Sequence, residues 1–273
     1  MKFDLHIHSK HSADSNSSVK DIINRAAAIG LNGISITDHN SFNGSEEALM
    51  LETKGTVIIP GAEYSTDEGH LLVYFLKSGL ERLNLKRDIL GRFHWRDIIE
   101  AAHDQGALVF LAHPFKSNRV HHKELLDLID GMEVYNSRAA LCRNMTANEQ
   151  ALNSVNALQK AFSVGSDAHW LAEIGHAYWE YEALSSNNTG NNSEAIKAAL
   201  KSGQGRVWGS ASQRLYEPSS QILKSFKTKS PMKAIKPCIK FGYCSLLEFW
   251  RIVGLGAKAF EGTIKPLNKE GGI

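Results

Sequence analysis

Short apolar runs alternate with amphipathic segments along the first two-thirds of the chain. Residues 2–7 predict a strand, and Ser18 followed by Asp21 predicts the start of a helix that ends before Gly30. A second helix is predicted near residues 97–105. Further strands are expected at residues 33–39, 57–65, 70–76, 107–114, 131–136 and 162–169.

This alternation predicts an α/β fold with a parallel, mostly closed sheet of about seven strands. The strands are almost continuously apolar, which is typical of a sheet covered by helices on one side and packed side chains on the other. A chain of 273 residues fits one barrel of about 200–250 residues with a short appendage. We therefore expect a barrel domain in residues 1–210 and a separate, helical extension in residues 211–273.

The extension is the basic part of the chain. Residues 215–273 hold ten Lys and Arg against four Asp and Glu, a net charge of +6 that leaves −4 for residues 1–214. The apolar stretch at 245–260 is too short and too charged for a bilayer crossing, which needs about 20 mostly apolar residues, so an amphipathic helix is expected. This helix could pack on the barrel, lie on an anionic membrane surface, or steer a nucleic acid towards the barrel.

Metal-ligating residue types stand at the ends of five predicted strands. Because side chains alternate along a strand, His6 and His8 face one side about 6–7 Å apart, and Asp167 and His169 repeat this spacing. In parallel α/β barrels such strand ends gather on one face, so we expect a metal site there. The residues concerned are His6, His8, Asp38, His39, Glu63, His113, Asp167 and His169, while His70 opens its strand instead.

Five motifs follow one another in residues 2–182: DLHIHSKHSAD, ITDHN, GAEYSTDEGH, LAHP and GSDAH. In this order they resemble the PHP (polymerase and histidinol phosphatase) superfamily. The resemblance implies a distorted (β/α)7 TIM-like barrel with two or three divalent metal ions, and mixed histidine and carboxylate sites accept zinc, manganese or iron.

The resemblance also implies which residues hold each ion. The first would be bound by His6, His8, Glu63 and Asp167, and Glu63 would bridge to a second completed by His70 and His113. A third would be bound by Asp14, His39 and His169. Asp38 is expected to orient a ligand histidine or to cap the following loop.

Three divalent cations among three carboxylates and six imidazoles would leave a site of about +3, which favours an anionic substrate. A hydroxide bridging the two metals linked by Glu63 would be the nucleophile for a phosphate ester. No GxSxG, P-loop or GxGxxG motif is present, so the metal is expected to carry the reaction. Glu63, Asp167 and Arg138 are the predicted catalytic residues. Arg138 would grip the phosphate, with Lys116 and Arg119 as further candidates.

The sequence leaves three functional hypotheses. The first is a phosphoesterase for a small phosphorylated metabolite or nucleotide, with histidinol phosphate as a familiar substrate of the family. The second is a 3′-5′ exonuclease or other nucleic-acid phosphodiesterase, and the third is a non-catalytic metal-binding module. Three cysteines without CxxC spacing and the lack of a leader after Met1 predict a cytoplasmic protein.

Overall fold

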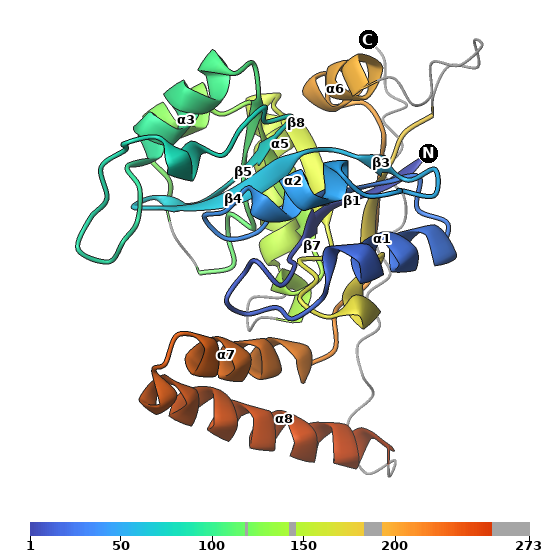
Figure 1. Ribbon diagram of the computed structural model, residues 1–273, viewed down its shortest axis with the longest axis vertical. Coiled ribbons are helices and arrows are strands. Elements are labelled where there is room, and N and C mark those ends of the chain that lie inside the picture. The colour runs from blue at the N-terminus through green and yellow to red at the C-terminus, as the bar shows by residue number, and fades with distance from the viewer. Residues whose placement is uncertain (118–119, 142–145, 183–192, 253–273) are drawn as a thin grey trace.

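The computed structural model describes residues 1–117, 120–141, 146–182 and 193–252, and its main body contains two mixed sheets of five strands (Figure 1). One sheet has the order β10-β9-β1-β2-β3 and the other β4-β5-β6-β7-β8. The strands are β1 Lys2–Ile7, β2 Gly33–Ile36, β3 Val57–Ile58, β4 Gly61–Thr66, β5 Gly69–Tyr74, β6 Leu108–Leu111, β7 Gly131–Asn136, β8 Ala161–Gly165, β9 Ala177–Glu180 and β10 Arg206–Gly209.

Helices connect and cover these strands. Ser18 accepts a hydrogen bond from the Asp21 N–H, so the first helix begins where the sequence predicts. Its apolar positions Val19, Ile22, Ile23 and Ala26 are buried. The helices are α1 Val19–Ala28, α2 Asn43–Leu49, α3 Trp95–Asp104, α4 Lys123–Leu128, α5 Ala147–Leu158, α6 Ser193–Lys201, α7 Tyr216–Lys227 and α8 Ile235–Ile252, with 3-10 turns at Leu80–Arg82, Ala139–Leu141, Leu171–Glu173 and Pro231–Ala234.

The α/β class is confirmed, but the sheets are mixed and do not form the predicted closed parallel barrel. Strands β4, β5 and β6 pair antiparallel, as do β1, β9 and β10. For β4 and β5 the physical reason is their short connection, because a parallel crossover needs a dozen or more residues. Gly69, with φ of 124°, turns the chain back directly after β4.

The two sheets meet at two isolated bridges rather than along continuous strands. Ile7 bridges to Ala168 beyond the end of β8, and His39 beyond β2 bridges to Glu63 of β4. Both bridges are parallel and involve residues within or beside the predicted metal-ligand motifs. The junctions between the sheets are therefore where the candidate ligands lie.

The described part of the extension is helical, as predicted. Helix α7 lies between the body of the molecule and α8, which forms the outer layer (Figure 1). The predicted amphipathic helix begins earlier than expected, at Ile235, and residues 253–260 of that prediction lie outside the described residues. None of the described helices has the length and apolar character needed to cross a bilayer. The proposed boundary at residue 210 stays a prediction.

Candidate metal centre

Strand β1 and the residue that follows it present His6 and His8 on one side, at a junction between the sheets. Residues two apart on a strand face the same way, and both imidazoles are fully buried. Gly165 at the end of β8 packs directly against this strand, because a Cβ atom there would lie 2.2 Å from the Cβ of His6. The glycine therefore lets β8 approach closely enough to deliver Asp167.

The first ligand group consists of His6, His8 and Asp167, with Glu63 at its edge. His6 Nε2 and His8 Nε2 lie 3.1 Å apart. Asp167 Oδ1 lies 3.5 Å from His6 Nε2 and 3.3 Å from His8 Nε2, and Glu63 Oε2 lies 3.5 Å from each nitrogen. Atoms that share a cation at about 2.0–2.2 Å stand roughly 3–3.5 Å from one another, so this spacing suits one metal ion.

Hydrogen bonds at the far side of each ring orient the two imidazoles. His6 Nδ1 donates to Glu133 Oε1 at 2.8 Å, and His8 Nδ1 donates to Ser12 Oγ at 3.2 Å. Ser12 Oγ in turn donates to Asp38 Oδ1 at 2.9 Å. These contacts leave both Nε2 lone pairs directed into the group. Asp38 thus acts on His8 through Ser12, in line with its expected orienting role.

Glu63 joins the first group to further histidines. Its Oε1 lies 2.8 Å from His70 Nδ1 and 3.2 Å from His113 Nε2, while its Oε2 lies 2.8 Å from His39 Nδ1. His70 opens β5, yet it lies beside Glu63 because β5 runs antiparallel to β4. One oxygen therefore faces each side, which is the arrangement of a carboxylate that can bridge two cations.

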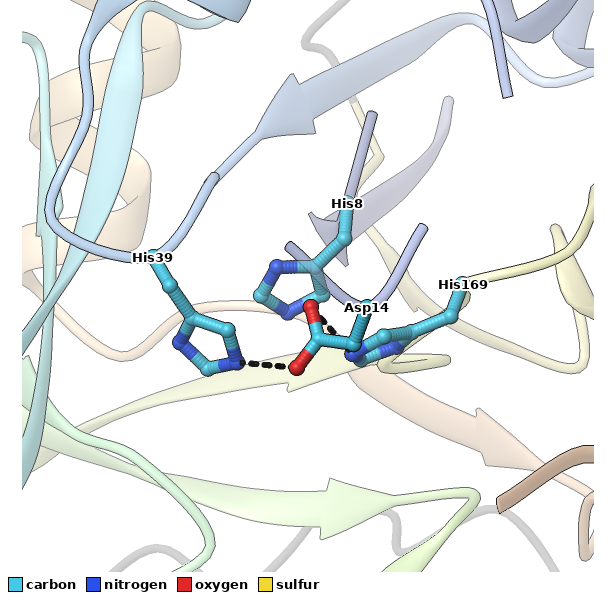
Figure 2. Close-up of side chains that lie close together, drawn as sticks. All are labelled: His8, Asp14, His39 and His169. Carbon is cyan, nitrogen blue, oxygen red and sulfur yellow. Dashed lines mark ion pairs between the residues drawn. The ribbon is translucent and has the colours of Figure 1, made fainter. Parts of the chain in front are cut away.

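Asp14 is the centre of the third group. His39 Nε2 lies 3.5 Å from Asp14 Oδ2 and His169 Nε2 lies 3.5 Å from Asp14 Oδ1. Figure 2 shows these two rings directed at the carboxylate, with the His8 ring beside them. All nine predicted ligands are brought together, but His8 and His39 each stand between two groups. The assignment of ligands to individual ions stays a prediction.

Three buried polar atoms test whether this cluster fits cations. Asp14 Oδ1, Glu63 Oε2 and His39 Nδ1 have no hydrogen-bond partner among the described residues. Glu63 Oε2 and His39 Nδ1 are only 2.8 Å apart, but their geometry is not that of a hydrogen bond. Buried polar atoms without partners are costly, so lone pairs that converge without bonding one another fit a bound metal ion.

The electrostatics of the cluster point the same way. Burial acts to raise the pKa of Glu63, but the surrounding imidazoles, His39 foremost, hold it well below its usual range. Burial acts to lower the pKa of His39, yet Glu63 and Asp14 raise it to about 10. Burial and the neighbouring imidazoles hold the pKa of His8 well below its usual range. The carboxylates are thus kept ionised, as cation binding requires.

Two candidate ligands have unusual backbone conformations. Asp167 has a backbone φ of 57° and His113 one of 28°, values that residues other than glycine seldom adopt. His113 N–H donates to Glu133 Oε2 at 2.8 Å, so Glu133 holds both His6 and His113. Backbone strain of this kind concentrates at functional sites.

A cavity of about 410 Å³ opens onto the cluster. Lys116 reaches into it and its Nζ lies 3.3 Å from Asp167 Oδ2. From the extension, Lys224 of α7 also lines the cavity, with Nζ 2.9 Å from Asp14 Oδ2. Two lysines of the cavity wall therefore contact candidate ligand carboxylates.

The predicted phosphate ligand Arg138 lines the same cavity but is 4% exposed. Its guanidinium donates two hydrogen bonds to Glu173, of 2.9 and 2.7 Å, and one of 2.9 Å to Ser220 of α7. These bonds tie the loop after β7 to the extension. A direct contact of Arg138 with substrate stays a prediction, and Arg119 lies outside the described residues.

Sequence reasoning missed three residues of this site. Glu133 could have been noticed, because it is a carboxylate within the apolar run GMEVYN. Glu173 supports His169, whose backbone N–H donates to Glu173 Oε2 at 3.0 Å. Lys224 carries no signal of its own among the many lysines of the extension. Only the folding of α7 against the loop that contains Asp14 places it at the site.

With this geometry in place, comparison with known proteins identifies the family. The sequence model of the PHP domain matches residues 4–227, which includes all nine candidate ligands and α7. The chain belongs to the PHP domain family.

Two relatives of this PHP domain protein come from Methanocaldococcus jannaschii. Uncharacterized protein MJ0417 is 31% identical over 193 residues, which cover 67% of this chain and 72% of that protein. Uncharacterized protein MJ1587 is 32% identical over 179 residues, which cover 60% of this chain and 98% of that protein. Neither name indicates a substrate.

Solved structures share the fold of this PHP domain protein. A two-domain protein from Bacteroides vulgatus containing a predicted PHP-like metal-dependent phosphoesterase has a TM-score of 0.59 at 19% identity, with 77% of this chain and 64% of that chain covered. PsfC from Pseudomonas syringae has a TM-score of 0.56 at 17% identity, with 90% of this chain and 98% of that chain covered. This chain thus spans less than two-thirds of the Bacteroides protein.

Proposed function

We propose that this protein is a metal-dependent phosphoesterase that hydrolyses a phosphate ester of a small metabolite or nucleotide. The observation that carries the proposal is the convergence of nine candidate ligands in one cluster beside a cavity that six of them line, with Asp14 Oδ1 and Glu63 Oε2 buried and without hydrogen-bond partners among the described residues. The residues would hold two or three divalent cations, zinc, manganese or iron.

Bound cations would supply positive charge for the phosphate and lower the pKa of water. In this proposal Glu63 and Asp167 would hold the cations. Glu133 and Ser12 act by fixing the ring orientation of His6 and His8. The protein's own groups therefore set the positions of the reacting atoms before substrate enters.

Lys116 and Lys224 are the proposed contacts of the substrate phosphate. Each ammonium lies at the cavity wall against a candidate ligand carboxylate. Cations held by these carboxylates would offset their negative charge, so that each ammonium would be available to a phosphate oxygen. The cavity of about 410 Å³ has room for a small ester.

The test is hydrolysis by protein reconstituted with zinc, manganese or iron, assayed by phosphate release from a panel of phosphorylated metabolites and nucleotides. Short single-stranded oligonucleotides in the same panel represent the phosphodiesterase alternative. His6→Ala with Asp167→Ala provides the inactive control. Metal-loaded protein that hydrolyses none of these compounds, or activity unchanged in the double variant, would contradict the proposal.

We also propose that the protein works in the cytoplasm. Cys238 and Cys244 are free cysteines, which agrees with a reducing compartment. The third cysteine, Cys142, lies outside the described residues.

A further inference from the structure

Helix α8 carries a row of exposed apolar side chains, here called the α8 stripe. Its members are Ile235, Ile239, Tyr243, Leu246 and Phe249, which are between 50% and 70% exposed. They are spaced four, four, three and three residues apart, so they follow one face of the helix over about 20 Å. An apolar face of this length is unusual on a surface exposed to water.

The opposite side of α8 packs against α7. Cys244 of α8 and Ala234 just before it are buried, and α8 lies on the outer side of α7 (Figure 1). Lys240 is paired with Glu217 of α7. Because this second face already contacts α7, the stripe faces away from α7 and is not needed to hold the hairpin of α7 and α8 together.

Positive charge gathers at the N-terminal end of the stripe. Lys229, Lys233 and Lys236 are exposed, and none of the three has an ion pair within the described part of the chain. The sequence has no Asp or Glu between residues 218 and 247. Two further apolar side chains, Phe226 at 64% and Met232 at 77% exposure, lie among these lysines. The N-terminal part of this surface is therefore both apolar and basic, and the one acidic residue of α8 is Glu248 near its C-terminal end.

The combination of apolar and basic side chains distinguishes between the partners that this surface could bind. A second copy of this surface would bring the same lysines together without acidic partners, which is repulsive. A nucleic acid offers phosphates to the lysines, but no apolar interior for side chains such as Ile239 and Leu246. The interface of an anionic bilayer offers negative headgroups and hydrocarbon together, and an amphipathic helix with flanking lysines is suited to it.

We propose that the α8 stripe and Lys229, Lys233 and Lys236 bind the surface of an anionic lipid bilayer, with α8 lying in the plane of the interface. The apolar side chains enter the boundary between headgroups and acyl chains. The lysines contact headgroup phosphates and carboxylates. The contact is peripheral and does not depend on the proposed phosphoesterase activity.

The experiment is sedimentation of the full chain with vesicles of phosphatidylcholine alone and with 30% phosphatidylserine. Binding is expected only with phosphatidylserine and should weaken with added salt. The variant with Ile239→Glu and Leu246→Glu should lose it. A matched variant with Met50→Glu and Ile89→Glu, which alters exposed apolar residues outside α8, should bind like the unmodified chain.

Replacing Lys229, Lys233 and Lys236 by Gln should weaken binding on the order of a hundredfold, because each lysine near such a surface contributes about a fivefold factor. The matched triple variant replaces Lys20, Lys86 and Lys123, which are exposed elsewhere, and should keep its affinity. Circular dichroism checks that every variant is folded.

Three results would overturn the proposal. The first is no binding of the full chain to phosphatidylserine vesicles. The second is a dimer, detected by light scattering, that the stripe variant abolishes while vesicle binding is absent. The third is lysine-dependent binding of a fluorescent oligonucleotide that the stripe variant leaves unchanged, again without vesicle binding.

Discussion

Glu133 Oε1 accepts a hydrogen bond of 2.8 Å from His6 Nδ1, and both side chains are buried. Its second oxygen accepts the backbone N–H of His113. One carboxylate therefore holds two candidate ligands that belong to different strands and face different sides of Glu63. A residue in this position affects the metal centre without being expected to touch a cation.

Replacing Glu133 by Gln should lower metal content and activity about 10- to 100-fold, because an amide is a weaker acceptor for the imidazole N–H. Metal analysis and phosphate release measure the two effects. Glu124→Gln, at an exposed carboxylate paired with Arg96, is the matched control and should change neither. A Glu133→Gln variant with full metal content and full activity would show that the hydrogen bond does not position His6.

Cation binding near pH 7 should release protons, on the order of two for a fully loaded site. Burial acts to lower the pKa of His6 and of His39, but neighbouring carboxylates have the larger, opposite effect. They raise the pKa of His6 well above its usual range and the pKa of His39 to about 10. Both rings are therefore protonated in the cation-free protein and must lose that proton to bind metal, so affinity should rise with pH. Calorimetry in buffers of different ionisation enthalpy counts the protons. An apparent enthalpy independent of buffer would contradict this expectation.

Removal of metal should destabilise the fold. A ligand that binds only the folded state raises the free energy of unfolding by about 2.7 kcal/mol when its concentration is 100 times its dissociation constant. The chelated protein should therefore unfold at a lower temperature, and added zinc or manganese should restore the original midpoint. Scanning calorimetry with and without chelator measures the shift. The His6→Ala and Asp167→Ala double variant should show little response to chelator, and an equal response would place the metal elsewhere.

Lys224→Ala should weaken phosphate binding while metal content stays unchanged. The ammonium lies 2.9 Å from Asp14 Oδ2 at the cavity wall, so its loss removes a positive charge from the substrate side. We expect about a tenfold higher KM, and a similar loss in affinity for inorganic phosphate measured by calorimetry on metal-loaded protein, since a charge-assisted hydrogen bond contributes about 1.5–3 kcal/mol. Lys20→Ala on α1 is the control. The phosphate measurement remains informative if none of the substrates tested is hydrolysed.

Local sequence patterns determined much of this protein. The Ser18 cap and the periodic apolar residues define α1, and the pair His6 with His8 follows from strand alternation. The same spacing did not place Asp167 and His169, because β8 ends at Gly165 and Asp167 has φ of 57°. These features depend on neighbours within a few residues. The resemblance carried by the five motifs added the remaining candidate ligands, and the structure brings them together.

Tertiary structure alone decided the rest. The sequence could not show that Glu133 would meet His6 from 127 residues away, because buried partners are chosen by the register of β7 and not by spacing along the chain. The antiparallel pairing of β4 with β5 arises from the short turn before Gly69, and the arrival of Lys224 beside Asp14 arises from the docking of α7. Contacts at long range depend on how preformed elements pack, and their spacing along the chain does not encode that packing directly.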